Sequence, residues 1–367
     1  MIRRVLIIGG YGNFGRYIAY QLAEDDNIQL IIAGRSKDKA ESFAGELIAE
    51  NHLEFAELDI HNDLIRHLAS INPDIVIHTS GPFQNQNYDV AKACIAVGCH
   101  YIDLADGRGF VEGITELSGE AAEKNLLLVS GASSVPCLTA ALVDHYLPEF
   151  ASLDRLDYGI TTAQKTNRGL ATTSAILGYV GKPFQTLEGG IPTTIYGWQD
   201  LHLRRYRDMG NRMLGNCDIP DLALFPKRYP DLKTIRFYAG LEVKLIHLGL
   251  WALSGLVRIG FMKRLQNLAP VLLKISFLFD WAGTANSGFH MELSGTGVDN
   301  KDKKIHFELT AKQGDGPYIP CTPAILLTRR LSKDDLPVVG AFPCIGLISK
   351  DEYLGALKNL DITWHEG

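Results

Sequence analysis

Three glycines near the start of the chain have the spacing of a phosphate-binding turn. They fit Gly-x-Gly-x-x-Gly directly after the apolar run Val5–Ile8 and directly before a helix-like stretch. In such a unit glycine permits a tight turn, close approach of a pyrophosphate to the backbone, and close packing of helix on strand. The helix N-terminus offers N–H groups and partial positive charge to the phosphates. We therefore predict a dinucleotide site at Gly9, Gly10, Tyr11, Gly12, Asn13, Phe14 and Gly15; a turn without a ligand is the alternative.

The end of the second predicted strand carries cations where a site for NAD would carry an acid. It reads Ala-Gly-Arg35-Ser36 and continues with Lys37 and Lys39. An acid there would bind the ribose hydroxyls and repel a 2′-phosphate, whereas Arg35 can bind that phosphate and Ser36 can donate a further hydrogen bond. Two charge-assisted bonds of about 1.5–3 kcal/mol each would favour NADP over NAD by roughly 10²–10⁴. The sequence thus predicts NADP as the cofactor, with a solvated Arg35 as the alternative.

Two further strand ends are expected at the same edge of the sheet, because ligands of open parallel sheets bind beyond the carboxyl ends of the strands. Asp59 and Ile60 close the third predicted strand, where an acid can reach the edge of adenine and an aliphatic side chain can cover its face. The fourth strand closes on four residues expected beside the nicotinamide half, which are Ser80, Gly81, Pro82 and Phe83. Plain turn chemistry is the alternative at both places.

Hydride transfer needs positioning and a group that supplies a proton or stabilises charge. Asp103 and Tyr101, on the fifth predicted strand, are the candidates for the catalytic role. A turn or helix-capping role is the alternative for Asp103, and His78 is expected to be a core histidine. No Cys/His group has the spacing of a zinc site, so we predict no metal.

The elements that position these residues follow from an alternation of short apolar runs and helix-like stretches over the first 131 residues. This alternation predicts an α/β fold with a doubly wound parallel sheet, the Rossmann arrangement. The predicted strands are Val5–Ile8, Gln29–Ala33, Glu54–Leu58, Asp74–Thr79, Tyr101–Leu104 and Leu126–Ser130. The predicted helices are Phe14–Ala23, Lys39–Ala49, Leu64–Ser70, Asp89–Val97 and Val111–Lys124.

A longer mixed region follows the regular alternation. Residues 288–297 and 304–313 alternate at period two, which predicts a pair of antiparallel strands. Near the end, Ser349 stands three residues before Glu352, a spacing typical of a capped helix.

The bulk composition excludes several classes of protein. A length of 367 residues suits two domains, and a net charge of −6 predicts no nucleic-acid partner. None of the six cysteines forms a Cys-x-x-Cys pair, which favours reduced thiols and a cytoplasmic location. The first apolar run is too short for a secretory signal and is predicted to be a strand.

Residues 245–281 are unusually apolar. The stretch Leu245–Met262 is about as long as the roughly 18 apolar residues that indicate a membrane span. His247 and Arg258 interrupt it, however, and a charge at the bilayer centre costs about 2.5–3.5 kcal/mol. We predict no transmembrane span and an apolar helical pair buried in the substrate domain or in a dimer interface. Weak contact of 245–281 with an anionic membrane surface, or a mouth for a lipid-like substrate, is the alternative.

Several stretches together resemble one family, the saccharopine dehydrogenase-like oxidoreductases. They are "GGYGNFGRYIAYQLA", "AGRS", "HTSGPFQNQNYDVAKACIAVGCHYIDLADGRGFV", "SGASSVPCLTAALVDHY", "NCDIPDLALFP" and "GAFPCIGLISKDEYLGALKNLDI". The resemblance implies a Rossmann NADP-binding domain over 1–135 and an α+β substrate and dimerisation domain over 136–330. It also implies a C-terminal segment over 331–367 whose helix returns to the first domain, and a homodimer acting on a small-molecule substrate.

The resemblance further implies an NADP-dependent dehydrogenase or reductase acting on an imine, a secondary amine or a more hydrophobic carbon centre. Saccharopine is a tricarboxylate, so its site needs several cations. The candidate cations here flank the segment "DIPDL" and are Arg204, Arg205, Arg207, Arg212, Lys227, Arg228 and Arg236. The apolar segment 245–281 favours a more hydrophobic substrate than saccharopine. The alternatives are a trans-acting enoyl reductase on a lipid-like substrate and a non-catalytic NADP-binding sensor or scaffold.

Overall fold

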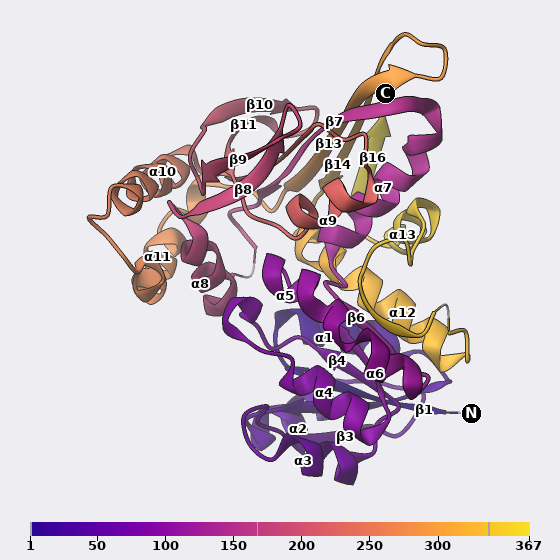
Figure 1. Cartoon of the computed structure of the whole chain (residues 1–367). Coiled ribbons are helices and arrows are strands. Elements are labelled where there is room, and N and C mark those ends of the chain that lie inside the picture. Colours follow the sequence, from indigo (N-terminus) through magenta and orange to yellow (C-terminus); the bar gives the residue numbers. More distant parts are fainter. Residues whose placement is uncertain (1, 167, 337) are drawn as a thin grey trace. The chain divides into compact units, whose positions relative to one another are not determined.

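The chain divides into two compact units in a computed structural model that describes residues 2–166, 168–336 and 338–367. Unit 1 consists of Met1–Leu138 and Tyr318–Tyr353, and unit 2 consists of Thr139–Pro317 and Leu354–Gly367. The predicted α/β class, with a parallel Rossmann sheet and a second domain, is confirmed (Figure 1). The predicted division at 135 and 330, into an NADP-binding domain, a substrate domain and a C-terminal segment, stays a prediction.

Unit 1 is built on a seven-stranded sheet in the order β15-β6-β5-β4-β1-β2-β3, with every pair of neighbours parallel. Its strands are β1 (Arg3–Ile8), β2 (Ile28–Gly34), β3 (Glu54–Glu57), β4 (Ile75–His78), β5 (His100–Asp103), β6 (Leu127–Ser130) and β15 (Gly340–Pro343). The six predicted strands are confirmed, including the one at the start of the chain. The sequence did not indicate β15, because it is short and ends in a proline, which only an edge strand tolerates.

Helices of unit 1 flank this sheet (Figure 1). They are α1 (Asn13–Ala23), α2 (Lys37–Glu46), α3 (Leu64–Ile71), α4 (Asp89–Val97), α5 (Arg108–Gly113), α6 (Ser118–Glu123) and α12 (Thr322–Ser332). A further helix, α13 (Lys350–Ala356), begins in unit 1 and ends in unit 2. The prediction of one helix over Val111–Lys124 is wrong: a 3₁₀ turn, Ile114–Leu117, separates α5 from α6. Glycines at 109, 113 and 119 lower the helix propensity of this stretch.

Both faces of the central strands of unit 1 are buried. Successive residues of β1, from Val5 to Ile8, are at most 1 % exposed although their side chains alternate between the two faces. A parallel sheet covered by helices on both sides requires such a continuous apolar run. The polar residues of this unit that could bind a ligand are therefore expected at the strand ends.

Unit 2 contains a mixed nine-stranded sheet with the main order β10-β11-β12-β7-β13-β14-β16, to which β8 and β9 are added beside β12. Its strands are β7 (Phe150–Thr162), β8 (Pro183–Glu188), β9 (Ile191–Tyr196), β10 (His202–Tyr206), β11 (Gly210–Asn216), β12 (Thr234–Leu241), β13 (Ser287–Gly297), β14 (Asp302–Ala311) and β16 (Ile362–Glu366). Its helices are α7 (Thr139–Tyr146), α8 (Leu170–Tyr179), α9 (Asp221–Arg228), α10 (Lys244–Arg258) and α11 (Ala269–Phe277). The predicted antiparallel pair is confirmed as β13 and β14.

The β10–β11 hairpin makes polar contacts with a distant part of the same sheet. Arg204 Nη1 on β10 lies 2.8 Å from Glu292 Oε1 on β13, and Tyr206 Oη lies 2.7 Å from His290 Nδ1. Three strands, β11, β12 and β7, lie between β10 and β13 in the sheet order. The hairpin therefore folds back over the sheet, and buried polar side chains fix its position.

The apolar segment 245–281 forms α10 and α11 with a connecting loop. Several of its large side chains are exposed, including Trp281 at 82 % and Phe261 at 80 %. The prediction that the helical pair is buried inside the substrate domain is therefore wrong for these side chains. Within the described residues, none of the helices combines the length and the apolar character that crossing a membrane requires.

Candidate cofactor site

The strand order of unit 1 reverses beside β1. From β1 the chain continues to β2 and β3 on one side, whereas β4, β5 and β6 lie on the other side. At such a switch point the connections leave in opposite directions and open a crevice beyond the carboxyl ends of the strands. The residues that follow β1, β2 and β4 are the predicted segments at Gly9, Arg35 and Ser80, so three predicted segments lie at the ends of adjacent strands.

The turn after β1 depends on two glycines. Gly9 has a φ of +81°, which L side chains rarely adopt. A Cβ on Gly15 would lie 2.3 Å from the carbonyl oxygen of Gly9, so any larger residue would push α1 away from the turn. The positive φ is at Gly9, one residue before the first glycine of the Gly-x-Gly-x-x-Gly pattern, and Gly10 has none.

Polar side chains after β4 hold this turn. Thr79 Oγ1 donates to the carbonyl oxygens of Ile8, at 2.9 Å, and of Gly9, at 3.2 Å. A Cβ on Gly9 would lie 2.7 Å from Ser80 Oγ. Thr79 directly precedes the predicted segment that starts at Ser80, but no local pattern in the sequence indicated its role.

The N-terminus of α1 fits the pyrophosphate of a dinucleotide. A Cβ on Gly12 would meet the carbonyl oxygen of Gly9, at 3.1 Å, and no other non-neighbouring atom of the described residues within 4 Å. The first turn of α1 carries no acidic residue. A phosphate can therefore approach the backbone at the positive end of the helix dipole without meeting a side chain or a negative charge.

The corner after β2 presents a cation and a helix cap. Arg35 is exposed, and in the described part of the chain it takes part in no ion pair. Ser36 caps α2, where its Oγ accepts from the backbone N–H of Lys39 at 3.4 Å. Tyr11 covers this corner: its Oη accepts from the backbone N–H of Ser36 at 3.1 Å, and a Cβ on Gly34 would collide with its ring. Tyr11 thereby connects the glycine turn to the predicted 2′-phosphate site, a contact that the sequence did not reveal.

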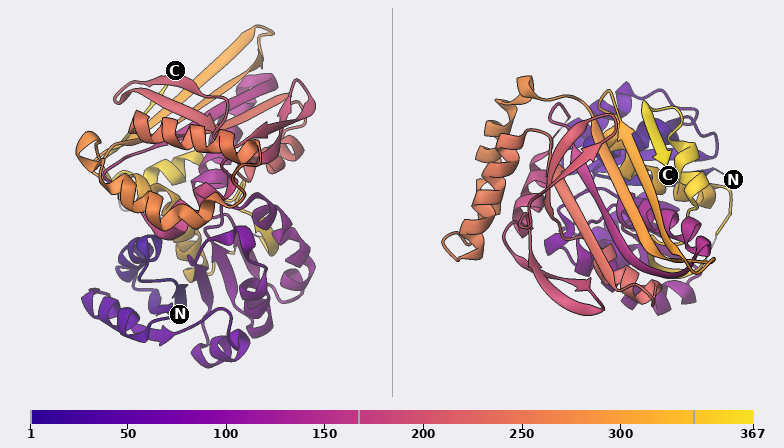
Figure 2. Two further views of the ribbon diagram at one scale, coloured as in Figure 1. Left: turned by 90° about the vertical axis from the view of Figure 1, so that its left-hand side faces the viewer. Right: turned by 90° about the horizontal axis from the view of Figure 1, so that it is seen from above.

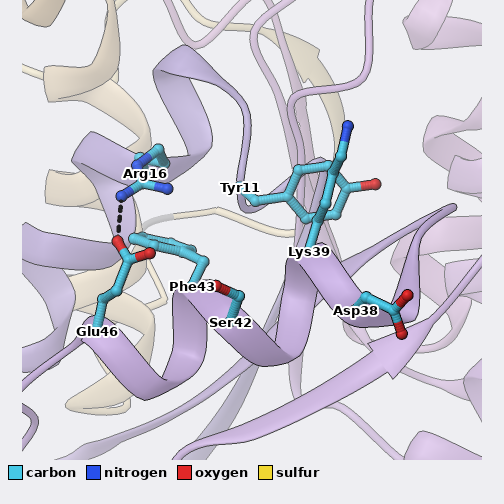
Figure 3. Close-up of a pocket in the computed structure, with 7 residues that line it drawn as sticks. All are labelled: Tyr11, Arg16, Asp38, Lys39, Ser42, Phe43 and Glu46. Carbon is cyan, nitrogen blue, oxygen red and sulfur yellow. Dashed lines mark hydrogen bonds and ion pairs between the residues drawn. The ribbon is translucent and has the colours of Figure 1, made fainter.

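A small open hollow lies beside this corner (Figure 3). Its lining residues are Tyr11, Arg16, Asp38, Lys39, Ser42, Phe43 and Glu46. Arg16 is engaged there, because its Nη2 lies 2.6 Å from Glu46 Oε2 and its guanidinium stacks 4.1 Å from the centre of the Phe43 ring. Lys39 is exposed and lines the hollow with Tyr11, so it is the second cation of this corner after Arg35.

The other predicted cofactor contacts are partly engaged in local structure. Asp59 Oδ1 accepts from the backbone N–H of His61 at 3.1 Å, a turn contact, and Ile60 packs against the core of unit 1. After Ser80, Gly81 and Pro82 are joined by a cis peptide bond. Phe83 is buried with its ring edge-on to His78, at 5.0 Å between ring centres. The cofactor roles of these residues stay a prediction.

The candidate catalytic residues lie inside unit 1. Asp103 is fully buried at the end of β5, and its Oδ1 accepts from the backbone N–H groups of Ala105 and Gly131, at 2.8 and 2.9 Å, and from Ser130 Oγ at 3.0 Å. Burial raises the pKa of Asp103 to about 6, although these hydrogen bonds act in the opposite direction. The three contacts tie the turn after β5 to the end of β6, which favours the turn role over direct contact with substrate.

Tyr101, two residues before Asp103 on β5, forms a buried pair with His78 at the end of β4. Tyr101 Oη lies 3.2 Å from His78 Nδ1, and both side chains are at most 1 % exposed. Burial lowers the pKa of His78 to about 3 and raises the pKa of Tyr101 well above its usual value. His78 is the core histidine that the sequence predicted, and Tyr101 is placed to position it.

Comparison with known families identifies unit 1. Residues 5–129 match the family described as the saccharopine dehydrogenase NADP binding domain. This part of the chain is a saccharopine dehydrogenase NADP-binding domain. The match covers the glycine turn, the Arg35–Ser36 corner, the segment after β4 and the end of β5, so NADP is confirmed as the cofactor.

A solved structure shows the same fold. Apo saccharopine dehydrogenase (L-Glu forming) from Saccharomyces cerevisiae has a TM-score of 0.67 at 12 % identity, with 100 % of both chains covered. The predicted resemblance to saccharopine dehydrogenase-like oxidoreductases is confirmed by the family match over residues 5–129, and the chain is an NADP-dependent dehydrogenase or reductase.

Two other structures score lower. An amine dehydrogenase from Mycobacterium smegmatis has a TM-score of 0.46 at 11 % identity, covering 93 % of this chain and 94 % of that one. A probable dehydrogenase from Thermotoga maritima has a TM-score of 0.47 at 10 % identity, covering 96 % and 93 %. Neither score is high enough to carry an argument. A sequence search among curated proteins found no match.

Proposed function

We propose that this protein transfers hydride between NADPH and a carbon centre of a largely apolar substrate. An imine or a secondary amine is the first candidate class of substrate. The saccharopine dehydrogenase NADP-binding domain supports the hydride chemistry and the carbon–nitrogen bond. The yeast relative is by its name a saccharopine dehydrogenase. Saccharopine is a tricarboxylate, so the question is whether the cations of this chain are available for three negative charges.

The observation that carries the proposal is that most candidate cations of unit 2 already have carboxylate partners. Arg204 pairs with Glu292 at 2.8 Å, Arg212 with Glu242 at 3.0 Å, Arg228 with Asp144 at 2.7 Å, and Arg236 with Asp200 at 3.2 Å. Arg212 and Glu242 are both buried. Charges neutralised in this way attract a tricarboxylate less strongly than unpaired cations would, which favours a substrate with little negative charge.

A lipid-like enoyl compound is the second candidate substrate. The exposed apolar side chains of residues 245–281, in unit 2, favour it, because such a surface can bind an acyl chain. A homodimer in the cytoplasm remains part of the proposal. The six buried free thiols support the location, and a mass measurement in solution tests the dimer.

In this proposal each strand end of unit 1 has one task. The glycine turn and the N-terminus of α1 bind the pyrophosphate, Arg35 and Ser36 bind the 2′-phosphate, Asp59 and Ile60 contact adenine, and Ser80–Phe83 lie along the nicotinamide half. Asp103 and Tyr101 act by positioning, since both are buried. NADPH supplies the hydride.

The test is a turnover assay of the full chain with NADPH and three compounds. These are the imine whose reduction yields saccharopine, an imine of an alkylamine with an aliphatic aldehyde, and a long-chain enoyl thioester. The alkyl imine or the enoyl compound should be reduced with kcat/KM about 100-fold above the value for the saccharopine-forming imine, the equivalent of two unmade charge-assisted bonds. NADH in place of NADPH is the control. Preference for the saccharopine-forming imine would refute the apolar substrate, and binding of NADPH without turnover of any compound would favour the sensor or scaffold.

A further inference from the structure

The exposed apolar surface of this protein is concentrated in one segment. Of the 22 large apolar side chains that are exposed in residues 2–166, 168–336 and 338–367, 12 lie within residues 245–281. Trp281, Phe261 and Ile259 are exposed by 82, 80 and 76 %. Soluble proteins rarely gather so much exposed apolar surface without a partner. Below, the apolar segment includes Lys244, the first residue of α10, and so spans residues 244–281.

Helix α10 has one face buried against the rest of unit 2 and one exposed apolar face. The covered face is buried and carries His247, Leu250 and Ser254. The other face carries Leu245, Leu248 and Trp251, three residues apart and exposed by 63, 37 and 40 %. Because residues three apart follow one stripe of a helix, the exposed side chains form a continuous face. Packing within unit 2 leaves this face exposed.

The second half of the apolar segment is fixed to unit 2. Gln164 Nε2 donates to the carbonyl oxygen of Ser276 at 2.7 Å and to Asp280 Oδ1 at 2.9 Å. Arg168 Nη2 lies 2.5 Å from Asp280 Oδ1, and the same guanidinium stacks 4.6 Å from the centre of the Phe277 ring. The left view of Figure 2 shows α10 and α11 on the same side of unit 2. The exposed aromatic side chains are therefore held on a defined scaffold.

The charge of the apolar segment is opposite to that of the chain. Between Glu242 and Asp280 it contains five cations and no acid, whereas the chain has a net charge of −6. The cations are Lys244, Arg258, Lys263, Arg264 and Lys274, all of them exposed. None of the five has a carboxylate partner among the ion pairs of the described residues. A partner that fits must combine an apolar interior with a negatively charged surface.

We propose that the apolar segment docks the protein on an anionic membrane surface. A bilayer that contains acidic lipids offers negative headgroups above hydrocarbon, and tryptophan, phenylalanine and leucine beside lysine and arginine are the side chains that bind there. A second copy of the chain fits less well. A symmetric interface places the same patch on both sides, so the two sets of five cations would face each other.

Sedimentation with vesicles tests this docking. The full chain, saturated with NADPH, is mixed with vesicles of phosphatidylcholine alone or with phosphatidylserine added. It should sediment with the mixed vesicles at low salt, bind neutral vesicles far less, and dissociate at high salt. The triple variant Lys263→Gln/Arg264→Gln/Lys274→Gln should lower the partition coefficient about 100-fold, at about five-fold per cation. Phe261→Ser and Trp281→Ser should lower it about ten-fold each.

Matched controls separate the segment from net charge and from folding. The variant Lys301→Gln/Lys333→Gln/Lys358→Gln removes the same charge at exposed sites outside the segment and should bind vesicles as the natural chain does. Ile191→Ser removes an exposed apolar residue outside the segment and should also have no effect. An unchanged midpoint of urea unfolding, followed by circular dichroism, shows that each variant is folded. Equal binding to neutral vesicles, or a dimer that Trp281→Ser dissociates while no vesicle is bound, would overturn the proposal.

Discussion

The two units of this protein place their polar residues differently. In unit 1 the interiors of the central strands are apolar, and charged groups stand at strand ends: Arg35 follows β2, and Arg4, near the start of β1, pairs with Glu54, the first residue of β3, at 2.7 Å. In unit 2 charged side chains lie within strands and pair there, as Arg204 on β10 does with Glu292 on β13. A sheet buried on both faces has no place for charges except at its ends, whereas a hairpin folded over a mixed sheet can enclose an ion pair. This difference teaches that the site of unit 1 could be located from sequence order, and that the charges of unit 2 could be interpreted only with their partners known.

The position of the four tryptophans allows the two units to be measured separately. All four, Trp198, Trp251, Trp281 and Trp364, belong to unit 2. Tryptophan emission therefore reports unfolding of unit 2, and the fluorescence of bound NADPH reports the site of unit 1. Tryptophan emission serves the prediction for unit 2, and NADPH fluorescence serves the one for the cofactor corner.

The largest effect is expected at the buried carboxylate of unit 2. Glu242 Oε1 lies 3.0 Å from Arg212 Nη2, and its Oε2 accepts from the backbone N–H groups of Gln164 and Thr284, both at 2.8 Å. Glu242→Gln leaves the buried guanidinium without its counter-charge and should lower the free energy of unfolding by about 3–5 kcal/mol. Urea unfolding followed by tryptophan emission measures it. Glu188→Gln removes an exposed partner of Arg236 and should cost less than about 1 kcal/mol; equal losses would refute the contrast.

The second prediction concerns pH and Asp103 in unit 1. Its pKa is raised from 3.8 to about 6 by burial, so the folded state favours the neutral carboxyl group. The stabilising contribution is present below about pH 4 and is lost as pH rises through 6, by about 3 kcal/mol in total. The free energy of unfolding of the natural chain minus that of Asp103→Asn should therefore fall by that amount between pH 4 and 7. The effect of His78, whose pKa is lowered, is present in both proteins and cancels.

Circular dichroism during urea unfolding at each pH measures this difference. Asp89→Asn makes the same substitution at an exposed position of α4 and is the control. A constant difference for Asp103→Asn across this range would mean that the hydrogen bonds to its Oδ1 outweigh burial.

The smallest predicted effect is at the cofactor corner. Arg35→Ala removes one charge-assisted contact to the 2′-phosphate and should weaken NADPH binding about 10–100-fold while leaving NADH binding unchanged. Titration of both cofactors by fluorescence measures it. Arg66→Ala removes an arginine that is exposed on α3 and should change neither affinity. Equal loss of NADPH and NADH affinity would mean that Arg35 does not bind the 2′-phosphate.

Much of unit 1 could be predicted because its signals are local. An apolar run of four to six residues that alternates with helix-like stretches is typical of a strand in a covered parallel sheet, and Gly12 and Gly15 fit their places through the backbone alone. The capped helix near the C-terminus is similar: Ser349 Oγ accepts from the backbone N–H of Glu352 at 3.2 Å, and Glu352 Oε2 accepts from the backbone N–H of Ser349 at 3.0 Å. In each case the interacting groups are within a few residues.

The remaining features depend on residues that are far apart in the sequence. The strand β15 exists because β6, more than two hundred residues earlier, offers it an edge. Tyr11 lies on Gly34, and Asp103 is tied to Ser130 and Gly131, only because neighbouring strands bring these residues together. The sequence determined that a phosphate-binding turn is followed by a cationic corner. The tertiary structure decided which arginines of unit 2 are neutralised and which apolar residues of 245–281 stay exposed, because pairing and burial are set by partners from other segments.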